Sequence, residues 1–385
     1  MLNFDGQIFS KLPQAGTSIF AVMTKMALDQ GAINLAQGFP DFPVSAKLIA
    51  RVNHYMKKGF NQYAPMPGVP ELRKAIAGKA FKTFGISYDP ESEITITAGA
   101  TQAICTAVSA FIKDGDEVII FEPAYDSYAP MVKVNGGIVK YVGLKAPLFQ
   151  IDWNEIKKMI SNRTRMIIIN SPHNPTGSLL HEADMKQLDT LTRNTDIIVL
   201  SDEVYEHLIF DGHTHQSACL YPELVKRSLV IGSFGKTFHA TGWKTGFVMA
   251  PEALSREFRK LHQFTVFASN TPIQYAIADF LADEDNYLPL PGFYQAKRDF
   301  FAEKMRGSRF ELIPCYGTYF QLLSYRSISS EPEMAFAAGL VREHGIALIP
   351  LSPFYQKETN QQLLRLCFAK KEETLSKAAD ILCRI

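Results

Sequence analysis

The chain has 385 residues, 46% of them hydrophobic and 21% charged, a composition typical of a soluble globular protein that excludes a disordered or collagen-like chain. There are 40 lysine and arginine residues against 39 aspartate and glutamate residues, so the net charge is +1 and no overall attraction to nucleic acid or to an anionic membrane is expected. The length predicts two or three domains.

The cysteines and the N-terminal segment predict a cytoplasmic protein. The five cysteines are widely spaced and include no Cys-x-x-Cys pair, which favours a reducing compartment. The N-terminal segment carries Asp5 and lacks a basic stretch followed by an apolar one, so it does not resemble a secretory signal. No uncharged apolar run approaches the roughly 18 residues that span a bilayer.

The first half of the chain predicts an arm followed by an α/β domain. Residues 1–44 include the segment QGFPDFP, rich in proline and glycine, and are expected to form an N-terminal arm and part of a smaller domain. Short apolar runs then alternate with helix-like segments, and the predicted strands cover residues 94–97, 117–121, 166–170, 197–201, 229–232 and 246–250. Most runs are apolar throughout, as in strands covered on both faces, so a mostly parallel sheet sandwiched by helices is expected.

A domain boundary is predicted at Leu288, where two prolines and a glycine precede a polar, helix-forming stretch. Residues 288–385 hold further strand candidates at 317–323, 346–350 and 362–367 and a final helix. The sequence therefore predicts a large domain over residues 45–287 and a smaller α+β domain over residues 288–385.

Polar residues gather after the predicted strands, where open α/β sheets bind their ligands. They are Ala100 and Thr101 at a helix start, Tyr125, Asn174, Asp202 with Tyr205, Ser233 with Lys236, and Lys244.

These groups suit a phosphorylated pyridine aldehyde. The helix N-terminus, the Ser233 hydroxyl and the Lys244 ammonium would hold a phosphate dianion. Asp202 would keep a pyridine nitrogen protonated, Tyr125 would stack on the ring, and the amide and phenol would donate to its oxygen. Lys236 would bond to the aldehyde. The cofactor described is pyridoxal 5′-phosphate.

The segments NSPHNPTG, SDEVYE and SFGKTFHATGWKTG, in this order and spacing, resemble the core of class I pyridoxal-phosphate-dependent aminotransferases of fold type I. The segments LAQGFPDF, NQYAPMPGVPELR, TAGATQAI and LLRLCFAK resemble other motifs of the family, so the resemblance covers nearly the whole chain. The text is most similar to the branch of kynurenine, glutamine and methionine aminotransferases, and within it to bacterial methionine aminotransferases.

The resemblance implies a role for each motif residue. Lys236 is the catalytic residue, and Asp202 pairs with the pyridine nitrogen. Tyr205 and Asn174 contact the ring oxygen, and Tyr125 stacks on the ring. The phosphate is held by Ser233, Lys244 and the backbone of Ala100 and Thr101. Arg365 binds the substrate α-carboxylate, with Gly38 and Asn174 nearby, and Tyr63 reaches the phosphate in a neighbouring subunit, which implies a homodimer. Many relatives have arginine where this chain has Lys244. Lysine keeps the positive charge but lacks the planar guanidinium fork of arginine.

Three other readings stay open beside this one. GSFGKT resembles the end of a Walker A loop, although its first glycine would have to fall at Val230. Ser233 and Lys236 fit the Ser-x-x-Lys motif of serine enzymes that react with β-lactams, and Lys244 begins a Lys-Thr-Gly, although the two motifs lie very close together. A fold type I protein that has lost activity is the third, and the retained Lys236, Asp202 and Arg365 argue against it.

No metal site is predicted. His213 and His215 lie in the segment DGHTH, which is expected to be an exposed turn, and His181 does not begin a His-Glu-x-x-His motif. His173 and His239 flank the predicted site and are expected to pack or to form hydrogen bonds there.

The substrate is expected to be an uncharged amino acid. No additional arginine for a distal carboxylate is identified, and the segments near the site offer Phe39, Tyr63, Tyr125, Phe238 and Phe267. Methionine is favoured, followed by aromatic amino acids, histidine, kynurenine and glutamine. The predicted reaction moves the α-amino group to a 2-oxo acid in two half-reactions, and a β-lyase acting on cysteine conjugates is the alternative.

Overall fold

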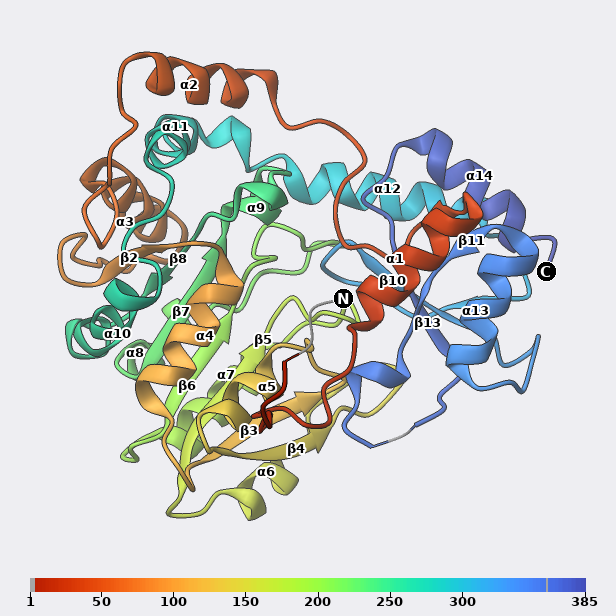
Figure 1. The fold of residues 1–385 in the computed structure, drawn as a ribbon, viewed down its shortest axis with the longest axis horizontal. Coiled ribbons are helices and arrows are strands. Elements are labelled where there is room, and N and C mark those ends of the chain that lie inside the picture. Colours follow the sequence, from red (N-terminus) through yellow and green to blue (C-terminus); the bar gives the residue numbers. More distant parts are fainter. Residues whose placement is uncertain (1–3, 358) are drawn as a thin grey trace.

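The computed structural model describes residues 4–357 and 359–385, in which a seven-stranded sheet dominates (Figure 1). The strand order is β2-β8-β7-β6-β5-β3-β4. The strands are β2 (Ile94–Thr97), β3 (Glu117–Glu122), β4 (Ile138–Gly143), β5 (Thr164–Asn170), β6 (Ile198–Asp202), β7 (Ser228–Ser233) and β8 (Gly246–Met249). Neighbours from β4 to β7 are parallel, and β8 runs antiparallel to both β7 and β2. The predicted mostly parallel α/β sheet is therefore confirmed.

Both faces of this sheet are covered, which explains why most of its inner strands are continuous apolar runs. Val118 and Ile120 of β3 belong to one buried cluster with residues of α4 (Ala100–Phe111) and α10 (Glu252–Thr265). Ile119 and Phe121 belong to a second cluster on the opposite face. Successive side chains of a strand point to opposite faces, so a strand buried on both sides needs apolar residues at every position.

The helices of this part pack around the sheet, and in Figure 1 α4 and α5 lie across its near face. They are α2 (Ala46–Lys57), α3 (Pro70–Phe84), α4 (Ala100–Phe111), α5 (Tyr128–Val134), α6 (Trp153–Met159), α7 (Glu182–Thr192), α8 (Pro222–Val225), α9 (Phe234–Thr237), α10 (Glu252–Thr265) and α11 (Thr271–Leu281). Among the helices in the described ranges, none combines the length and the apolar character that crossing a membrane requires.

A second, smaller group of elements follows α11. Its four-stranded antiparallel sheet has the order β12-β13-β10-β9. Its elements are α12 (Leu290–Lys304), β9 (Glu311–Leu312), β10 (Phe320–Ser324), α13 (Glu333–His344), β11 (Ile346–Ala347), β12 (Ile349–Pro350), β13 (Leu363–Cys367) and α14 (Glu372–Leu382). Near the N-terminus, α1 (Ile19–Gln30) packs on α13, and β1 (Ile33–Asn34) pairs with β11.

Two strand predictions need correction, and one strand of the large sheet was not predicted. The strand expected at 317–323 begins at Phe320, because the backbone N–H groups of Gly317 and Thr318 donate to Gly177 and Leu208 in loops of the larger part. The run 346–350 forms two strands in different sheets, since β11 pairs with β1 and β12 with β13. Strand β4 is absent from the predictions because it lies at the sheet edge and is largely half-exposed, so it carries no continuous apolar run.

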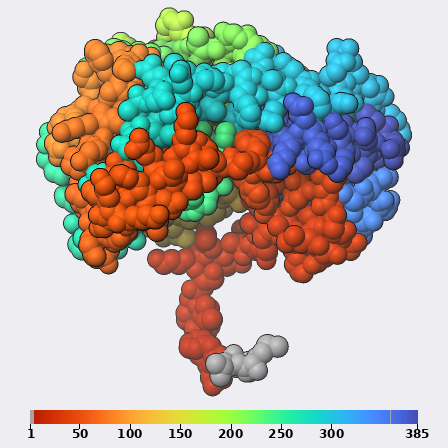
Figure 2. Space-filling view, turned by 90° about the horizontal axis from the view of Figure 1, so that it is seen from above, coloured from red at the N-terminus to blue at the C-terminus, as the bar shows by residue number. Residues whose placement is uncertain are grey.

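The segment between residue 4 and α1 stands away from the body of the chain (Figure 2). Phe4, Ile8 and Phe9 in this segment are 72%, 76% and 81% exposed. Large apolar side chains on an extended segment gain stability only when another surface covers them.

Candidate active site

The register of the large sheet brings the predicted residues together at the carboxyl ends of its parallel strands. Asn170 at the end of β5 pairs with Asp202 at the end of β6, and Ser233 ends the next strand, β7. A cavity of about 260 Å³ opens at this edge. Its lining includes Gly38, Ala100, Thr101, Tyr125, Asn174, Asp202, Tyr205, Ser233, Lys236, Lys244 and Arg365. The structure therefore gathers every predicted site residue except Tyr63.

One end of the cavity is a cradle for an anion. Helix α4 begins at Ala100, after Gly99 with a φ of 85°, a conformation that glycine adopts without strain. A Cβ on Gly246 would lie 3.0 Å from the Ala100 nitrogen, so glycine there lets β8 pass close to the helix start. Lys244 and Ser233 face the same cavity. Free N–H groups at a helix start, a hydroxyl and an ammonium suit a phosphate.

Asp202 is a buried carboxylate with a partner that the sequence analysis missed. The hydroxyl of Tyr128 donates to Asp202 Oδ2 at 2.5 Å. Desolvation raises the pKa of Asp202 to about 6, and the Tyr128 hydrogen bond works against that rise. A protonated ring nitrogen placed beside this carboxylate would favour its charged form. Tyr125 lies in the turn just before the helix that begins at Tyr128, and the two rings pack edge-to-face with their centres 5.5 Å apart.

Lys236 lines the cavity and is held there by two hydrogen bonds. It lies in the single turn α9 that follows β7, and its Nζ donates to the Tyr319 hydroxyl at 2.9 Å and to the Gly38 carbonyl at 3.3 Å. Desolvation lowers the pKa of the Lys236 amine to about 8. A buried amine with a lowered pKa holds a larger neutral fraction near neutral pH than an exposed lysine does. The ring of Tyr205 lies 5.6 Å from the same nitrogen.

Arg365 is a fully buried cation at the centre of β13. Its Nη1 donates to Asn174 Oδ1 at 2.7 Å and its Nη2 to the Ala36 carbonyl at 3.2 Å, whereas its Nε finds no acceptor among the described residues. No carboxylate within the described ranges forms an ion pair with this guanidinium. A buried charge needs a partner, so Arg365 is suited to an anionic ligand.

The loop that carries Asn174 is fixed by Asn170, a second residue that the sequence analysis missed. Asn170 Oδ1 accepts from the Asn174 backbone nitrogen at 2.8 Å, and its Nδ2 donates to the Asp202 carbonyl at 2.9 Å. Asn170 thus ties the loop after β5 to the end of β6. The first residue of NSPHNPTG is the last residue of a strand, which was the available signal for this role.

Four of the five aromatic residues proposed for the substrate pocket do not line the cavity; only Tyr125 does. Phe238 is a core residue, 4% exposed and stacked on Phe234. Tyr63 is 83% exposed and packs edge-to-face on Phe267, and Phe39 lies under the Lys370 ammonium. Sequence proximity to a motif does not determine which way a side chain points.

Aromatic side chains from distant segments take their place. Phe20 of α1 and Phe320 of β10 line the cavity, and the Arg365 guanidinium lies 3.9 Å from the Phe320 ring centre and 5.2 Å from that of Phe20. Tyr319, beside Phe320, contacts Lys236. No local pattern in the sequence marks these residues, because they reach the cavity only when the smaller sheet packs on the larger one.

One of the histidine predictions is wrong. His213 is exposed, but His215 is largely buried, with its Nε2 2.7 Å from Glu203 Oε2. The turn is covered on one side because the Glu203 carboxylate needs a partner inside the protein. His173 is buried beside a threonine hydroxyl of its own loop, and His239 packs on aromatic rings, as expected. The described part of the chain contains no group of three potential metal ligands.

The donor set of the cavity fits pyridoxal 5′-phosphate. A helix start with an ammonium and a hydroxyl faces the same space as a buried carboxylate, a buried amine and an aromatic ring. These are the groups that the phosphate, ring nitrogen, aldehyde and ring face of that cofactor require. The orphaned Arg365 Nε adds a position for a second anion.

Comparisons with known proteins agree with this site. The sequence matches the profile of the family described as aminotransferase class I and II over residues 25–382. Methionine aminotransferase of Escherichia coli is 48% identical over 372 residues, covering 96% of each chain. Kynurenine–oxoglutarate transaminase 1 of Mus musculus is 32% identical over 398 residues, covering 94% of this chain and 93% of the mouse protein.

Solved structures give the same result. The structure of a methionine aminotransferase from Escherichia coli matches with a TM-score of 0.96 and 47% identity, covering 98% of this chain and 100% of that one. N-succinyldiaminopimelate aminotransferase of Mycobacterium tuberculosis matches with a TM-score of 0.94 and 36% identity, covering 98% and 100% of the two chains.

The fold and the cavity are therefore those of a fold type I pyridoxal-phosphate enzyme. The chain belongs to the class I and II aminotransferases. It is a pyridoxal 5′-phosphate-dependent enzyme that exchanges amino groups between amino acids and 2-oxo acids, and the family assignment favours this transfer over the β-lyase alternative.

Proposed function

We propose that this aminotransferase takes an uncharged amino acid as its donor, methionine foremost, followed by aromatic amino acids, histidine and glutamine. The observation that carries the proposal is the buried Arg365, which faces the same cavity as Lys236. Of its five N–H groups, two have acceptors in the structure, so the others are free to bind a carboxylate as a bidentate pair.

The walls of the cavity support an uncharged side chain. Phe20, Ile104, Val204 and Phe320 line it, which suits a thioether or an aromatic ring. Within the described residues, Lys236, Lys244 and Arg365 are the cations of the lining, and the proposal gives all three a role. No further cation of the lining is then available for the distal carboxylate of an acidic substrate. Similarity to a methionine aminotransferase points the same way.

The residues of the site divide the work in this proposal. Pyridoxal 5′-phosphate, when bound, supplies a protonated ring that stabilises negative charge at the substrate α-carbon. Asp202 keeps the ring nitrogen protonated, and Tyr125 covers the ring face. Lys236 takes the proton from the α-carbon, while Arg365 fixes the carboxylate and so sets the direction of the C–H bond.

The remaining contacts position the cofactor. We propose that Ala100, Thr101, Ser233 and Lys244 hold its phosphate. Asn174 and Tyr205 would contact its ring oxygen, and Gly38 and Asn174 would border the substrate. These assignments are supported by the shared cavity that the residues line.

We further propose a homodimer in which Tyr63 completes the partner's phosphate site. Tyr63, Phe264 and Phe267 are 83%, 86% and 48% exposed, and the N-terminal segment also presents large apolar side chains. Exposed aromatic groups of this kind mark surfaces that another chain covers. The cytoplasm stays the proposed location, and residues 1–44, 45–287 and 288–385 stay the proposed division into arm, large domain and small domain.

A screen of amino donors against several 2-oxo acids tests the substrate. The purified enzyme is incubated with methionine, phenylalanine, histidine, glutamine, kynurenine and aspartate, and the product 2-oxo acids are measured. The highest kcat/KM is expected for methionine and the lowest for aspartate. Efficient use of aspartate would contradict the proposal, because it would require a cation that the cavity does not offer.

A further inference from the structure

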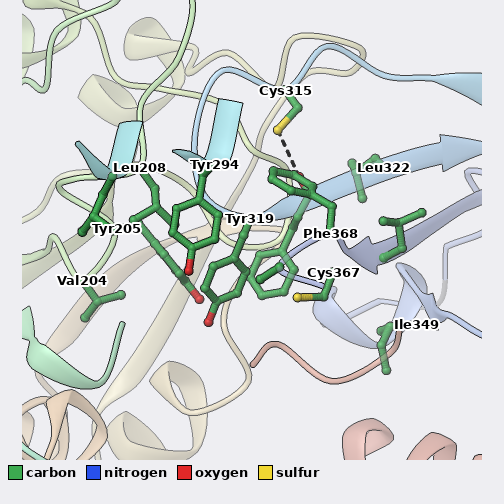
Figure 3. Close-up of a cluster of buried hydrophobic side chains, with 14 of the residues drawn as sticks. Val204, Tyr205, Leu208, Tyr294, Cys315, Tyr319, Leu322, Ile349, Cys367 and Phe368 are labelled. Atoms are coloured by element: carbon green, nitrogen blue, oxygen red, sulfur yellow. Dashed lines mark hydrogen bonds between the residues drawn. The ribbon is translucent and has the colours of Figure 1, made fainter. Parts of the chain in front are cut away.

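Three tyrosines from distant parts of the chain pack together beside the active site, and one of them, Tyr205, lines its cavity. Figure 3 shows Tyr205, Tyr294 and Tyr319 side by side, with their hydroxyls on the same side of the cluster. All three are buried, and Tyr294 and Tyr319 have no exposed surface. Tyr319 is the member of this cluster that forms a hydrogen bond to Lys236.

The hydrogen bonds around the Tyr319 hydroxyl have a fixed direction. A phenol has a single proton to donate, and Tyr319 donates it to the Gly38 carbonyl at 2.7 Å. The hydroxyl can therefore only accept from the Lys236 amine, which lies at 2.9 Å. The Gly38 carbonyl is a second acceptor, 3.3 Å from the same nitrogen.

Packing holds both acceptors in place. A Cβ on Gly38 would lie 2.6 Å from the Phe320 ring, so only glycine lets this carbonyl come so close. The Tyr319 ring packs edge-to-face on Phe320 at 4.9 Å and on Tyr205 at 5.2 Å. Neither acceptor can move without displacing the core.

Two acceptors decide how a neutral amine is oriented. A neutral Nζ has two N–H bonds and one lone pair, so when both N–H bonds point at Tyr319 and Gly38, only the lone pair is left to face the cavity. When the nitrogen takes a proton from the substrate α-carbon, the C–H electron pair stays on the substrate. The third N–H bond then points into the cavity, from which the same proton can be returned.

We propose that Tyr319 is a positioning residue that, together with the Gly38 carbonyl, orients the Lys236 amine with its lone pair toward the substrate. The inference rests on the proposed role of Lys236 as the base. It adds a residue that lies outside every motif used to identify the site.

Other ionisable groups surround Lys236 and bear on how it titrates. The ones that influence its charge are Asp202, Lys244, Arg365 and Cys367, with the Tyr205 and Tyr319 phenols in contact range. None of them other than Tyr319 forms a hydrogen bond to Nζ within the described residues. Removing the Tyr319 hydroxyl withdraws an acceptor from the ammonium form, so the pKa of Lys236 is expected to fall.

The test compares Tyr319→Phe with Tyr294→Phe in the holoenzyme. Tyr294 is a matched control because it is equally buried in the same cluster and its hydroxyl has no hydrogen-bond partner among the described residues. With an excess of amino donor, which displaces Lys236, the amine is trace-labelled with acetic anhydride across pH 6 to 10. Labelling of the Lys236 peptide is measured by mass spectrometry, with the exposed Lys47 as internal reference.

The wild-type labelling midpoint is expected below that of an ordinary exposed lysine, because burial lowers the pKa of the Lys236 amine. In Tyr319→Phe it should fall by about 0.4 to 1 pH unit, the equivalent of one hydrogen bond, and kcat should drop at least about tenfold with a smaller change in the donor KM. Tyr294→Phe should resemble the wild type in both measurements, and melting temperatures confirm that both variants fold.

Two results would overturn the inference: an unchanged midpoint and kcat in Tyr319→Phe, or equal effects in the two variants. Failure of the proposed function has a different signature, namely a wild-type enzyme that transfers no amino group, or a Lys236→Ala variant that still does. The labelling midpoints test the role of Tyr319 in either case, because they report on the Lys236 amine rather than on amino-group transfer.

Discussion

Replacing Arg365 tests the carboxylate site most directly. In the structure its guanidinium donates one N–H to the Asn174 side chain and one to the Ala36 carbonyl, and its Nε has no acceptor among the described residues. A bound carboxylate would therefore receive two charge-assisted hydrogen bonds from the unused donors. At about 1.5 to 3 kcal/mol each, their loss in Arg365→Ala amounts to about 3 to 6 kcal/mol.

This free energy corresponds to a fall in kcat/KM of roughly 10² to 10⁴. Arg365→Lys keeps a point charge but loses the planar fork, so a smaller fall of about 10- to 150-fold is expected. The assay follows methionine transamination under steady-state conditions, with the melting temperature of each variant as a check on folding. Arg342→Ala, at an exposed position of α13, is the control and should leave kcat/KM unchanged.

If Arg365→Ala kept kcat/KM within about threefold for every amino acid tested, well below the loss of one charged hydrogen bond, another residue would have to bind the carboxylate. A loss in the Lys variant as large as that in the Ala variant would show that the fork, rather than the charge, dominates binding.

Further predictions concern the amine, the carboxylate, the shared site and a buried ion pair. Lys236→Ala should abolish transamination and the borohydride-reducible bond to the cofactor, as measured by activity and by mass spectrometry after reduction. Asp202→Asn should lower kcat by at least about tenfold, because an amide cannot hold the ring nitrogen protonated, and an unchanged kcat in the pH-independent range would contradict this role. If sites are shared across a dimer, mixing inactive Tyr63→Ala and Lys236→Ala chains should restore up to about a quarter of the wild-type activity. Half of the randomly formed dimers then contain one chain of each kind, and each of these has one complete site out of two. No restoration after confirmed subunit exchange would argue against sharing. Glu206 lies 2.6 Å from the Lys79 ammonium and has a pKa lowered to about 2. Its contribution to stability is therefore present above its unfolded-state pKa and is lost as the pH falls toward 2. Glu206→Gln should cost about 3 to 5 kcal/mol of unfolding free energy at pH 7 and weaken the loss of stability at acid pH, as measured by urea denaturation.

The sequence carries much of the site because its residues follow strand ends. Parallel strands place their carboxyl ends at one edge, so polar residues after β5, β6 and β7 converge once the strands pair in register. This is why Asn174, Asp202 and Lys236 could be predicted from the local sequence. The apolar strands also predicted the sheet, because burial on both faces leaves a run that is easy to recognise.

The sequence was less informative where a residue's role depends on two distant elements. Strand β4 escaped prediction because its edge position exposes one side. Phe238 lies within an active-site motif yet points into the core, whereas Tyr128 reaches Asp202 across 74 positions of sequence. Side-chain direction at such positions follows from packing, which local periodicity does not record.

From the sequence alone came the α/β class, the cofactor and many of the polar residues that line the cavity, because short-range spacing along strands and turns specifies them. Only the tertiary structure decided which aromatic rings line the substrate cavity and what holds the Lys236 amine. Phe20, Tyr319 and Phe320 come from segments that meet the large sheet only when the smaller part of the chain packs against it. Contacts of that kind depend on how two packed cores fit together, and they leave no periodic trace in either segment.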